Sequence, residues 1–171
     1  MAMNISKAIF EDIPQLEILI NNAYRGEQSK KGWTTEANLL DGKRTDADAL
    51  KKIMSQPGVA ILKYCNDDNR LTGCVYLKKN FYKMYLGMLT VSPDLQARGI
   101  GKQLLKASEQ YAKENKCDAI EMTVISIRHE LIAWYERHGY FKTGETRPFT
   151  VDPKFVKSKQ PLEFIVLEKS L

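Results

Sequence analysis

The segment Leu89–Lys102 constrains the fold of this chain more than any other. An apolar stretch ends at Ser92-Pro93, where proline removes a hydrogen-bond donor, and a short turn then leads to Gly99-Ile100-Gly101 and an amphipathic helix. The first N–H groups of a helix have no partner within it, and the helix dipole is positive there. The glycines lack the Cβ atoms that would hold a ligand away from these amides, and Arg98 and Lys102 add positive charge. The segment therefore predicts a strand, turn and helix that bind a pyrophosphate. The alternative is an ordinary glycine-containing turn before a surface helix.

Hydrophobic periodicity predicts further strands and helices around this segment. We expect strands at residues 5–10, 59–65, 71–79, 83–91, 118–125, 140–143 and 163–167, and helices at residues 12–23, 46–54, 99–116 and 130–138. Antiparallel strands come first, and strands alternating with helices follow, which is typical of a mixed α/β sheet. A chain of 171 residues suits one domain, so we expect residues 1–171 to form a single unit.

Composition argues against several other classes of protein. The 26 Lys and Arg exceed the 21 Asp and Glu by only five and are interleaved with them, which does not favour nucleic-acid binding but suits a small polyanionic ligand. Three Cys without a close pair and two His favour neither a disulfide scaffold nor a metal site. Glu11 and Asp12 lie where a signal peptide would need its apolar stretch. No part of the sequence has a run close to the roughly 18 apolar residues that span a bilayer. We expect a soluble, cytoplasmic protein without a membrane partner.

The turn around the glycines resembles a family signature. No Walker loop is present, and the dinucleotide-binding glycine pattern is incomplete. Instead, Gln96-Ala97-Arg98-Gly99-Ile100-Gly101 resembles the Q/R-x-x-G-x-G/A motif of the GNAT superfamily of acyl-CoA-dependent N-acetyltransferases. The preceding Leu89-Thr90-Val91-Ser92-Pro93 and the later Trp134-Tyr135-Glu136-Arg137-His138-Gly139-Tyr140 resemble two further motifs of that family. The resemblance implies a mixed, mostly antiparallel sheet that is flanked by helices and splayed between its fourth and fifth strands, at residues 83–91 and 118–125.

The resemblance also implies roles for individual residues. Acetyl-CoA would be the co-substrate, with no metal. The backbone of Leu89, Thr90 and Val91 would bind the pantetheine arm, with Gly87 marking the bulge or close approach that splaying needs. The pyrophosphate would lie on Gln96, Ala97, Arg98, Gly99, Ile100, Gly101 and Lys102. Tyr135 would protonate the departing thiolate, whereas core packing against Leu131 is the alternative.

Two positions depart from the family pattern. Arg128 stands where many members have an asparagine that contacts the cofactor, and it either reaches a phosphate or faces solvent. Thr123 stands where some members carry a glutamate general base. Glu121 lies two residues earlier on the same face of the strand, so it is a candidate base, with a solvated strand residue as the alternative.

The segment before the sheet is where such proteins bind the acceptor. Tyr24, Trp33 and Glu36 are the candidate substrate-binding residues, although Trp33 could be a core anchor and Glu36 the start of a helix. We expect Asp41, Arg44 and the loop from Arg147 to Gln160 to contribute to the same site. His129 and His138 are expected to be solvated. The resemblance implies direct transfer of an acetyl group to a primary amine of a small molecule or peptide, and Thr123 favours a less basic amine. A non-catalytic acyl-CoA sensor or interaction module is the competing hypothesis, nucleic-acid binding is a third, and a homodimer is left open.

Overall fold

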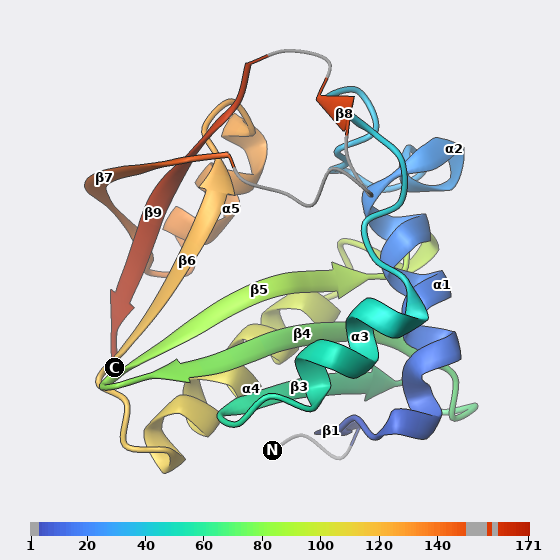
Figure 1. Cartoon of the computed structure of the whole chain (residues 1–171), viewed down its shortest axis with the longest axis horizontal. Helices are drawn as coiled ribbons and strands as arrows, with labels where there is room; N and C mark the ends of the chain where they lie inside the picture. Colours follow the sequence, from blue (N-terminus) through green and yellow to red (C-terminus); the bar gives the residue numbers. More distant parts are fainter. Residues whose placement is uncertain (1–3, 150–156, 159–160) are drawn as a thin grey trace.

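A seven-stranded mixed sheet carries the candidate site, in the strand order β1-β3-β4-β5-β6-β9-β7. The computed structural model describes residues 4–149, 157–158 and 161–171 (Figure 1). Every neighbouring pair of strands is antiparallel except β5 and β6, which are parallel. The strands of the sheet are β1 (Ile5–Lys7), β3 (Val59–Cys65), β4 (Leu71–Asn80), β5 (Lys83–Val91), β6 (Ala119–Ile125), β7 (Phe141–Pro148) and β9 (Glu163–Ser170), and a separate pair joins β2 (Leu40–Asp41) to β8 (Lys157–Ser158).

Helices cover both faces of this sheet, as Figure 1 shows with α1 and α3 in front and α4 behind. The helices are α1 (Ile13–Tyr24), α2 (Gly26–Ser29), α3 (Ala47–Met54), α4 (Ile100–Glu114) and α5 (His129–Arg137), with short 3-10 turns η1 (Phe10–Asp12) and η2 (Pro93–Leu95). Each face has its own apolar core. Because side chains alternate along a strand, Ile61 of β3 packs into the core of α1 and α3, and its neighbour Leu62 packs into the core of α4 and α5.

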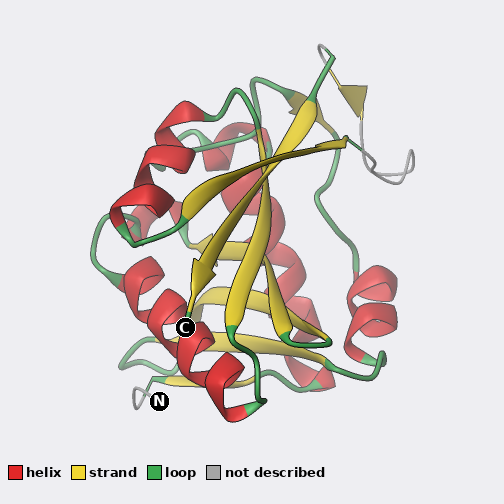
Figure 2. Ribbon diagram, turned by 90° about the vertical axis from the view of Figure 1, so that its left-hand side faces the viewer, coloured by secondary structure: helices red, strands yellow, loops and turns green. Residues whose placement is uncertain are grey.

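The sheet is splayed between β5 and β6, as the family resemblance implied. Only Lys83–Tyr85 pair with Ala119–Glu121, and the two strands then diverge (Figure 1). In the view of Figure 2, one group of strands runs across the lower half while the other rises through the upper half. The mixed, mostly antiparallel sheet flanked by helices is therefore confirmed.

A bulge in β5 lies directly after Gly87 rather than at it. Thr90 pairs with Cys74 and Gly87 with Tyr76, so Met88 and Leu89 together face the single residue between Cys74 and Tyr76. Met88 has φ +48°, a left-handed conformation that is uncommon for a residue with a side chain. The bulge therefore re-aims the backbone at the end of β5 where the two halves of the sheet part.

Most predicted elements are confirmed to within a few residues, and two differ. The first strand ends at Lys7 instead of Phe10, because the Asp12 carboxylate accepts a hydrogen bond from the Ile9 N–H (2.8 Å) and turns the chain into η1. The strand expected at 140–143 continues to Pro148, because pairing with β9 resumes at Thr146. No helix within the described ranges has the length and apolar character needed to cross a bilayer.

Candidate active site

Two cavities meet at the end of β5, where the sheet opens. The larger has a volume of about 540 Å³ and the smaller about 270 Å³. Both are lined by Tyr24 of α1, Leu89 of β5, Arg128 before α5, and Leu131 and Tyr135 of α5. These five residues therefore lie where the two chambers adjoin, a place that we call the passage.

The smaller cavity is built around the segment that opens α4. Most of the residues predicted to bind the cofactor line it: Leu89, Thr90, Val91, Gln96, Ala97, Gly99, Ile100, Gly101, Lys102 and Arg128. Arg98 is exposed and is not part of this lining, so its predicted role has no support from the geometry. The chain enters α4 through left-handed residues, Ala97 at φ +64° and Gly99 at φ +84°.

The amides at the start of α4 are available to a ligand. Within the described ranges, none of the backbone N–H groups of residues 97–102 donates a hydrogen bond to the protein; the first donor is Gln103, to the Gly99 carbonyl (3.0 Å). A Cβ built on Gly99 would meet nothing within 4 Å, so this side of the turn is open. Unpaired amides at the positive end of a helix fit a diphosphate.

Aromatic side chains form the opposite wall of the smaller cavity. Trp33 packs against Trp134 with ring centroids 6.3 Å apart, and His138 lies 4.3 Å from Trp134. Gln96 connects this wall to β5, because its Oε1 accepts from the Trp33 N–H (3.0 Å) and its Nε2 donates to the Val91 carbonyl (3.2 Å). Trp33 therefore lines the chamber of the predicted cofactor and is 43% exposed, so it is not a core anchor.

Tyr135 lies between the two cavities. Its side chain is buried and packs edge-on against Trp134 and Tyr140, and its hydroxyl makes no hydrogen bond to any group in the described part of the chain. Burial raises the pKa of this phenol well above its ordinary value, so Tyr135 holds its proton at neutral pH. Both predicted roles are compatible with this position, since the ring packs in the core and also lines the passage.

Tyr24 is the second tyrosine of the passage. Its hydroxyl donates a hydrogen bond to the Leu89 carbonyl (2.8 Å), which ties α1 to the bulged end of β5. Burial raises the pKa of Tyr24 to about 12. Tyr24 was predicted to bind the acceptor, and it lines both chambers.

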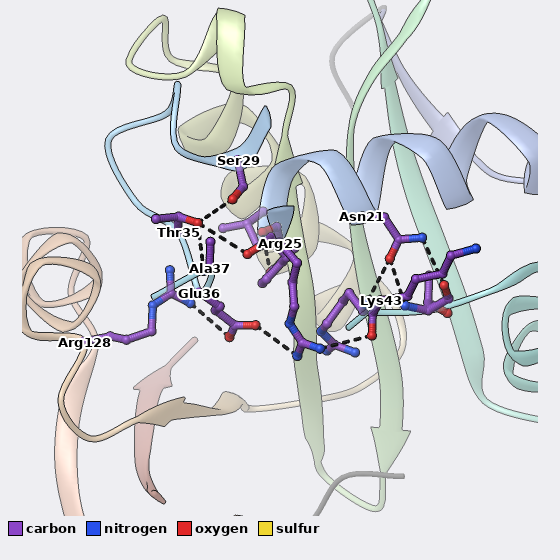
Figure 3. Close-up of polar contacts among 12 residues, drawn as sticks. Asn21, Arg25, Ser29, Thr35, Glu36, Ala37, Lys43 and Arg128 are labelled. Carbon is purple, nitrogen blue, oxygen red and sulfur yellow. Dashed lines mark hydrogen bonds and ion pairs between the residues drawn. The ribbon is translucent and has the colours of Figure 1, made fainter. Parts of the chain in front are cut away.

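A buried cluster of charges lines the larger cavity, and Figure 3 shows Glu36 between Arg25 and Arg128. Glu36 lies between two arginines: its Oε1 is 3.3 Å from Arg25 Nη2, and its Oε2 is 3.2 Å from Arg128 Nη1. All three residues are no more than 7% exposed. Glu36 starts a turn rather than a helix, because its carbonyl accepts from the N–H groups of Leu39 and Leu40.

The expectation that Arg128 faces solvent is wrong. Its guanidinium is held inside by Glu36 and by the hydroxyl of Thr34, and only its Nε lacks a hydrogen bond within the described residues. The buried carboxylate of Glu36 accounts for the position of Arg128 without a phosphate. Nothing in its immediate sequence indicates this partner, because the two residues lie 92 positions apart.

Glu121 is a poor candidate for the general base. It is bound to Arg147 (2.8 Å) and lines neither cavity, while its neighbour on the same face, Thr123, accepts or donates a hydrogen bond with the Tyr85 hydroxyl (2.8 Å). The site therefore offers no carboxylate without a cationic partner among the described residues of the cavity walls. No cluster of three or more His, Cys, Asp or Glu suited to a metal occurs in the described ranges.

Trp134 and His138 line the smaller chamber and were not among the predicted site residues. Arg44 and Arg147, which were expected to contribute to the acceptor site, line the larger chamber, as does Arg25. His138 was expected to be solvated, but its Nδ1 lies 2.7 Å from the Trp134 carbonyl and its ring is half-buried, whereas His129 is exposed as expected. The spacing of Trp134 and His138, one helical turn apart beside Tyr135, could have indicated this wall. Part of the loop from 147 to 160, which we expected to contribute to the acceptor site, lies outside the described residues.

Comparison with known proteins agrees with this architecture. The model of the acetyltransferase (GNAT) family matches residues 20–140, which is more than half of the chain. N-alpha-acetyltransferase 30 of Dictyostelium discoideum is 29% identical over 111 residues, which cover 62% of this chain and 59% of that relative. The chain thus matches little more than half the length of this curated relative.

Solved structures show the same fold. The ribosomal-protein-S18-alanine N-acetyltransferase of Escherichia coli superposes with a TM-score of 0.72 at 12% identity, covering 97% of this chain and 92% of that chain. A GNAT family acetyltransferase of Elizabethkingia anophelis with acetyl-CoA bound has a TM-score of 0.59 at 17% identity, covering 72% of this chain and 82% of that chain. With the splayed sheet and the matched segment in agreement, the chain belongs to the acetyltransferase (GNAT) family.

Proposed function

We propose that this protein transfers an acetyl group from acetyl-CoA to a primary amine of a small molecule or peptide, by direct attack of the amine. The observation that carries the proposal is the position of Tyr135, a protonated phenol between a chamber with unpaired helix amides and a second, larger chamber. The smaller chamber would hold the cofactor and the larger one the acceptor amine.

The residues of the smaller chamber fit acetyl-CoA. The amides of residues 97–102 would bind its diphosphate, with Lys102 adding charge, and the bulged backbone at Leu89–Val91 would bind the pantetheine arm. Trp33 and Trp134 would cover the bound cofactor from the other side. Acetyl-CoA supplies the acetyl group as a thioester, and the family uses this co-substrate.

Tyr135 would act as the acid for the departing thiolate. An ordinary phenol has a pKa of about 10 and a thiol about 8.5, so complete proton transfer between them costs roughly 2 kcal/mol. Burial raises the pKa of Tyr135, and the same dry surroundings would also raise the pKa of the coenzyme A thiol. The gap between the two pKa values therefore grows less than the pKa of Tyr135 does. Donation that accompanies departure of the thiolate is therefore feasible.

The acceptor would arrive at the passage as a neutral amine. Glu36, the carboxylate of the larger chamber, is already bound by two guanidinium groups, so the described walls of this chamber offer no carboxylate without a cationic partner. At pH 7 about one α-amine in ten is neutral, against fewer than one lysine-type amine in a thousand. We therefore propose an α-amine or another amine of low pKa as the acceptor, a choice that the similarity to N-alpha-acetyltransferase 30 of Dictyostelium discoideum also favours.

The proposal is tested by the release of free thiol from acetyl-CoA in the presence of amino acids, peptides, polyamines and aminoglycosides. We expect amine-dependent release that falls at least a hundredfold in Tyr135→Phe, because removing a general acid typically costs 10²–10⁴ in rate. Tyr140→Phe is the matched control, since this buried tyrosine packs against Tyr135 but lines neither cavity. Tight cofactor binding without thiol release for any amine would instead favour an acyl-CoA sensor.

A further inference from the structure

Resting on the proposed acetyl transfer, we propose that the acceptor amine also carries a carboxylate, which is bound by the guanidinium of Arg44 in the larger chamber. The carboxylate belongs either to an amino acid that is itself the acceptor or to an acidic side chain near the amine of a peptide. Both sources present the same planar anion to the cavity.

The charges that line the larger chamber are unevenly compensated. Its charged residues are Arg25, Arg44, Arg128, Arg147 and Glu36. Arg147 is neutralised by Glu121 and Glu145, each 2.8 Å away. Glu36 bridges Arg25 and Arg128, and Glu130 lies 3.8 Å from the Arg128 Nε. Each of these arginines therefore has an acidic partner, and Arg44 is the lining arginine that differs.

Arg44 has no carboxylate partner among the described residues. Its guanidinium carbon lies 5.5 Å from the centroid of the Tyr24 ring, and no ion pair joins it to a described residue. Burial lowers the pKa of the neighbouring Arg25, and the positive charge of Arg44 lowers it further, so the two guanidinium groups lie close enough to repel each other. A half-buried guanidinium with five N–H donors in a fixed fork is suited to bind a carboxylate with two hydrogen bonds.

The backbone holds Arg44 in place before any ligand arrives. The Asn21 Oδ1 accepts hydrogen bonds from the N–H groups of Arg44 (2.7 Å) and Thr45 (3.1 Å), and the Asn21 Nδ2 donates to the Thr45 carbonyl (3.0 Å). Arg25 Nη1 donates to the Lys43 carbonyl (3.0 Å) on the other side (Figure 3). This clamp fixes the loop before α3, so little backbone entropy is lost when Arg44 binds an anion.

Tyr24 connects this anion site to the reacting strand. Arg44 lies over the face of the Tyr24 ring, while the hydroxyl at the end of that ring is bonded to the Leu89 carbonyl in the passage. A carboxylate held by Arg44 would therefore leave the rest of the same small molecule, or the first residues of a peptide, extending along Tyr24 toward the passage.

Binding of acetylated products tests the carboxylate separately from catalysis. We would titrate N-acetyl-leucine against N-acetyl-leucinamide, and acetyl-Ala-Asp-amide against acetyl-Ala-Asn-amide, into the protein saturated with coenzyme A. In one of the two pairs, we expect the compound with the carboxylate to bind about 10- to 100-fold more tightly than the matching amide. This is the range that a hydrogen bond to a charged group contributes. Preference in the first pair identifies an amino acid as the source, and preference in the second an acidic peptide.

Variants at two adjacent positions locate the effect. Arg44→Gln should reduce the preference for the acid to less than threefold, while Arg44→Lys should keep part of it. Lys43→Gln removes a charge from the same loop, where the lysine side chain is 69% exposed and does not line the chamber, and it should keep the whole preference. Equal binding of acid and amide in both pairs by the unaltered protein would overturn the inference, as would an undiminished preference in Arg44→Gln. Absence of thiol release for every amine would overturn the proposed function alone.

Discussion

Removing the charge of Glu36 should strongly destabilise the protein. Its carboxylate is the shared partner of Arg25 and Arg128, and all three groups are buried. Glu36→Gln keeps the shape of the side chain but removes the buried carboxylate that bridges the two guanidinium groups. Breaking a buried ion pair by removing one partner costs about 3–5 kcal/mol, because the remaining charge is neither hydrated nor compensated.

This loss is large beside the total stability of a small protein, which is about 5–15 kcal/mol. For a chain of this length, a loss of 1 kcal/mol lowers the melting temperature by about 2–4 °C. Glu36→Gln should therefore melt about 6–20 °C below the unaltered protein, with a matching shift in the urea midpoint. Adding salt to the unaltered protein should not lower its melting temperature by a comparable amount, because salt screens buried ion pairs poorly.

The matched control is Glu130→Gln. Glu130 also faces Arg128, at 3.8 Å from its Nε, but its side chain is 48% exposed, and such a pair contributes at most about 1 kcal/mol. Chemical denaturation of the two variants in parallel measures the difference. If Glu36→Gln loses no more stability than Glu130→Gln, the buried cluster does not hold α1, the turn at Glu36 and the start of α5 together as we describe.

Two further changes have distinct outcomes. Gly99→Ala and Gly144→Ala both place a side chain at a left-handed φ (+84° and +88°) with nothing within 4 Å. Each substitution should lower the free energy of unfolding, measured with denaturant, by about 1–2 kcal/mol. Only Gly99→Ala should weaken the binding of acetyl-CoA measured by calorimetry. Equal affinity of the two variants for acetyl-CoA would contradict the diphosphate site at the amides of residues 97–102. Burial raises the pKa of Tyr24 to about 12, so its contribution to stability is complete below pH 10 and is lost as the pH rises toward 12. Tyr24→Phe should lose less stability than the unaltered protein between pH 10 and 12, and an unchanged pH slope would argue against this burial.

Local signals in the sequence were sufficient for much of the fold. The Asp46 carboxylate caps α3 by accepting from the Ala49 N–H (2.8 Å), and the strand at 118–125 alternates buried Ile120 and Met122 with the half-buried Glu121, both as the pattern predicts. The strand, turn and helix around Gly99 also follow from neighbouring residues alone. Such features depend on hydrogen bonds and periodicity within a few positions of the chain.

The parts that sequence could not predict depend on distant partners. Arg128 is buried because Glu36 lies beside it in space, and Trp33 reaches the cofactor chamber because Gln96, 63 positions away, binds its N–H. The β5 bulge falls on Met88 rather than Gly87. The register between β4 and β5 decides where the extra residue lies, and this register does not follow the local preference for glycine. These contacts shape the walls of both chambers, and local sequence patterns do not reveal them.

A structure of the protein with acetyl-CoA tests the central claim most directly. We predict that the diphosphate oxygens lie within hydrogen-bonding distance of the amides of residues 97–102 and that the thioester sulfur lies beside the Tyr135 hydroxyl. A diphosphate bound elsewhere, with those amides facing away from it, would contradict the account.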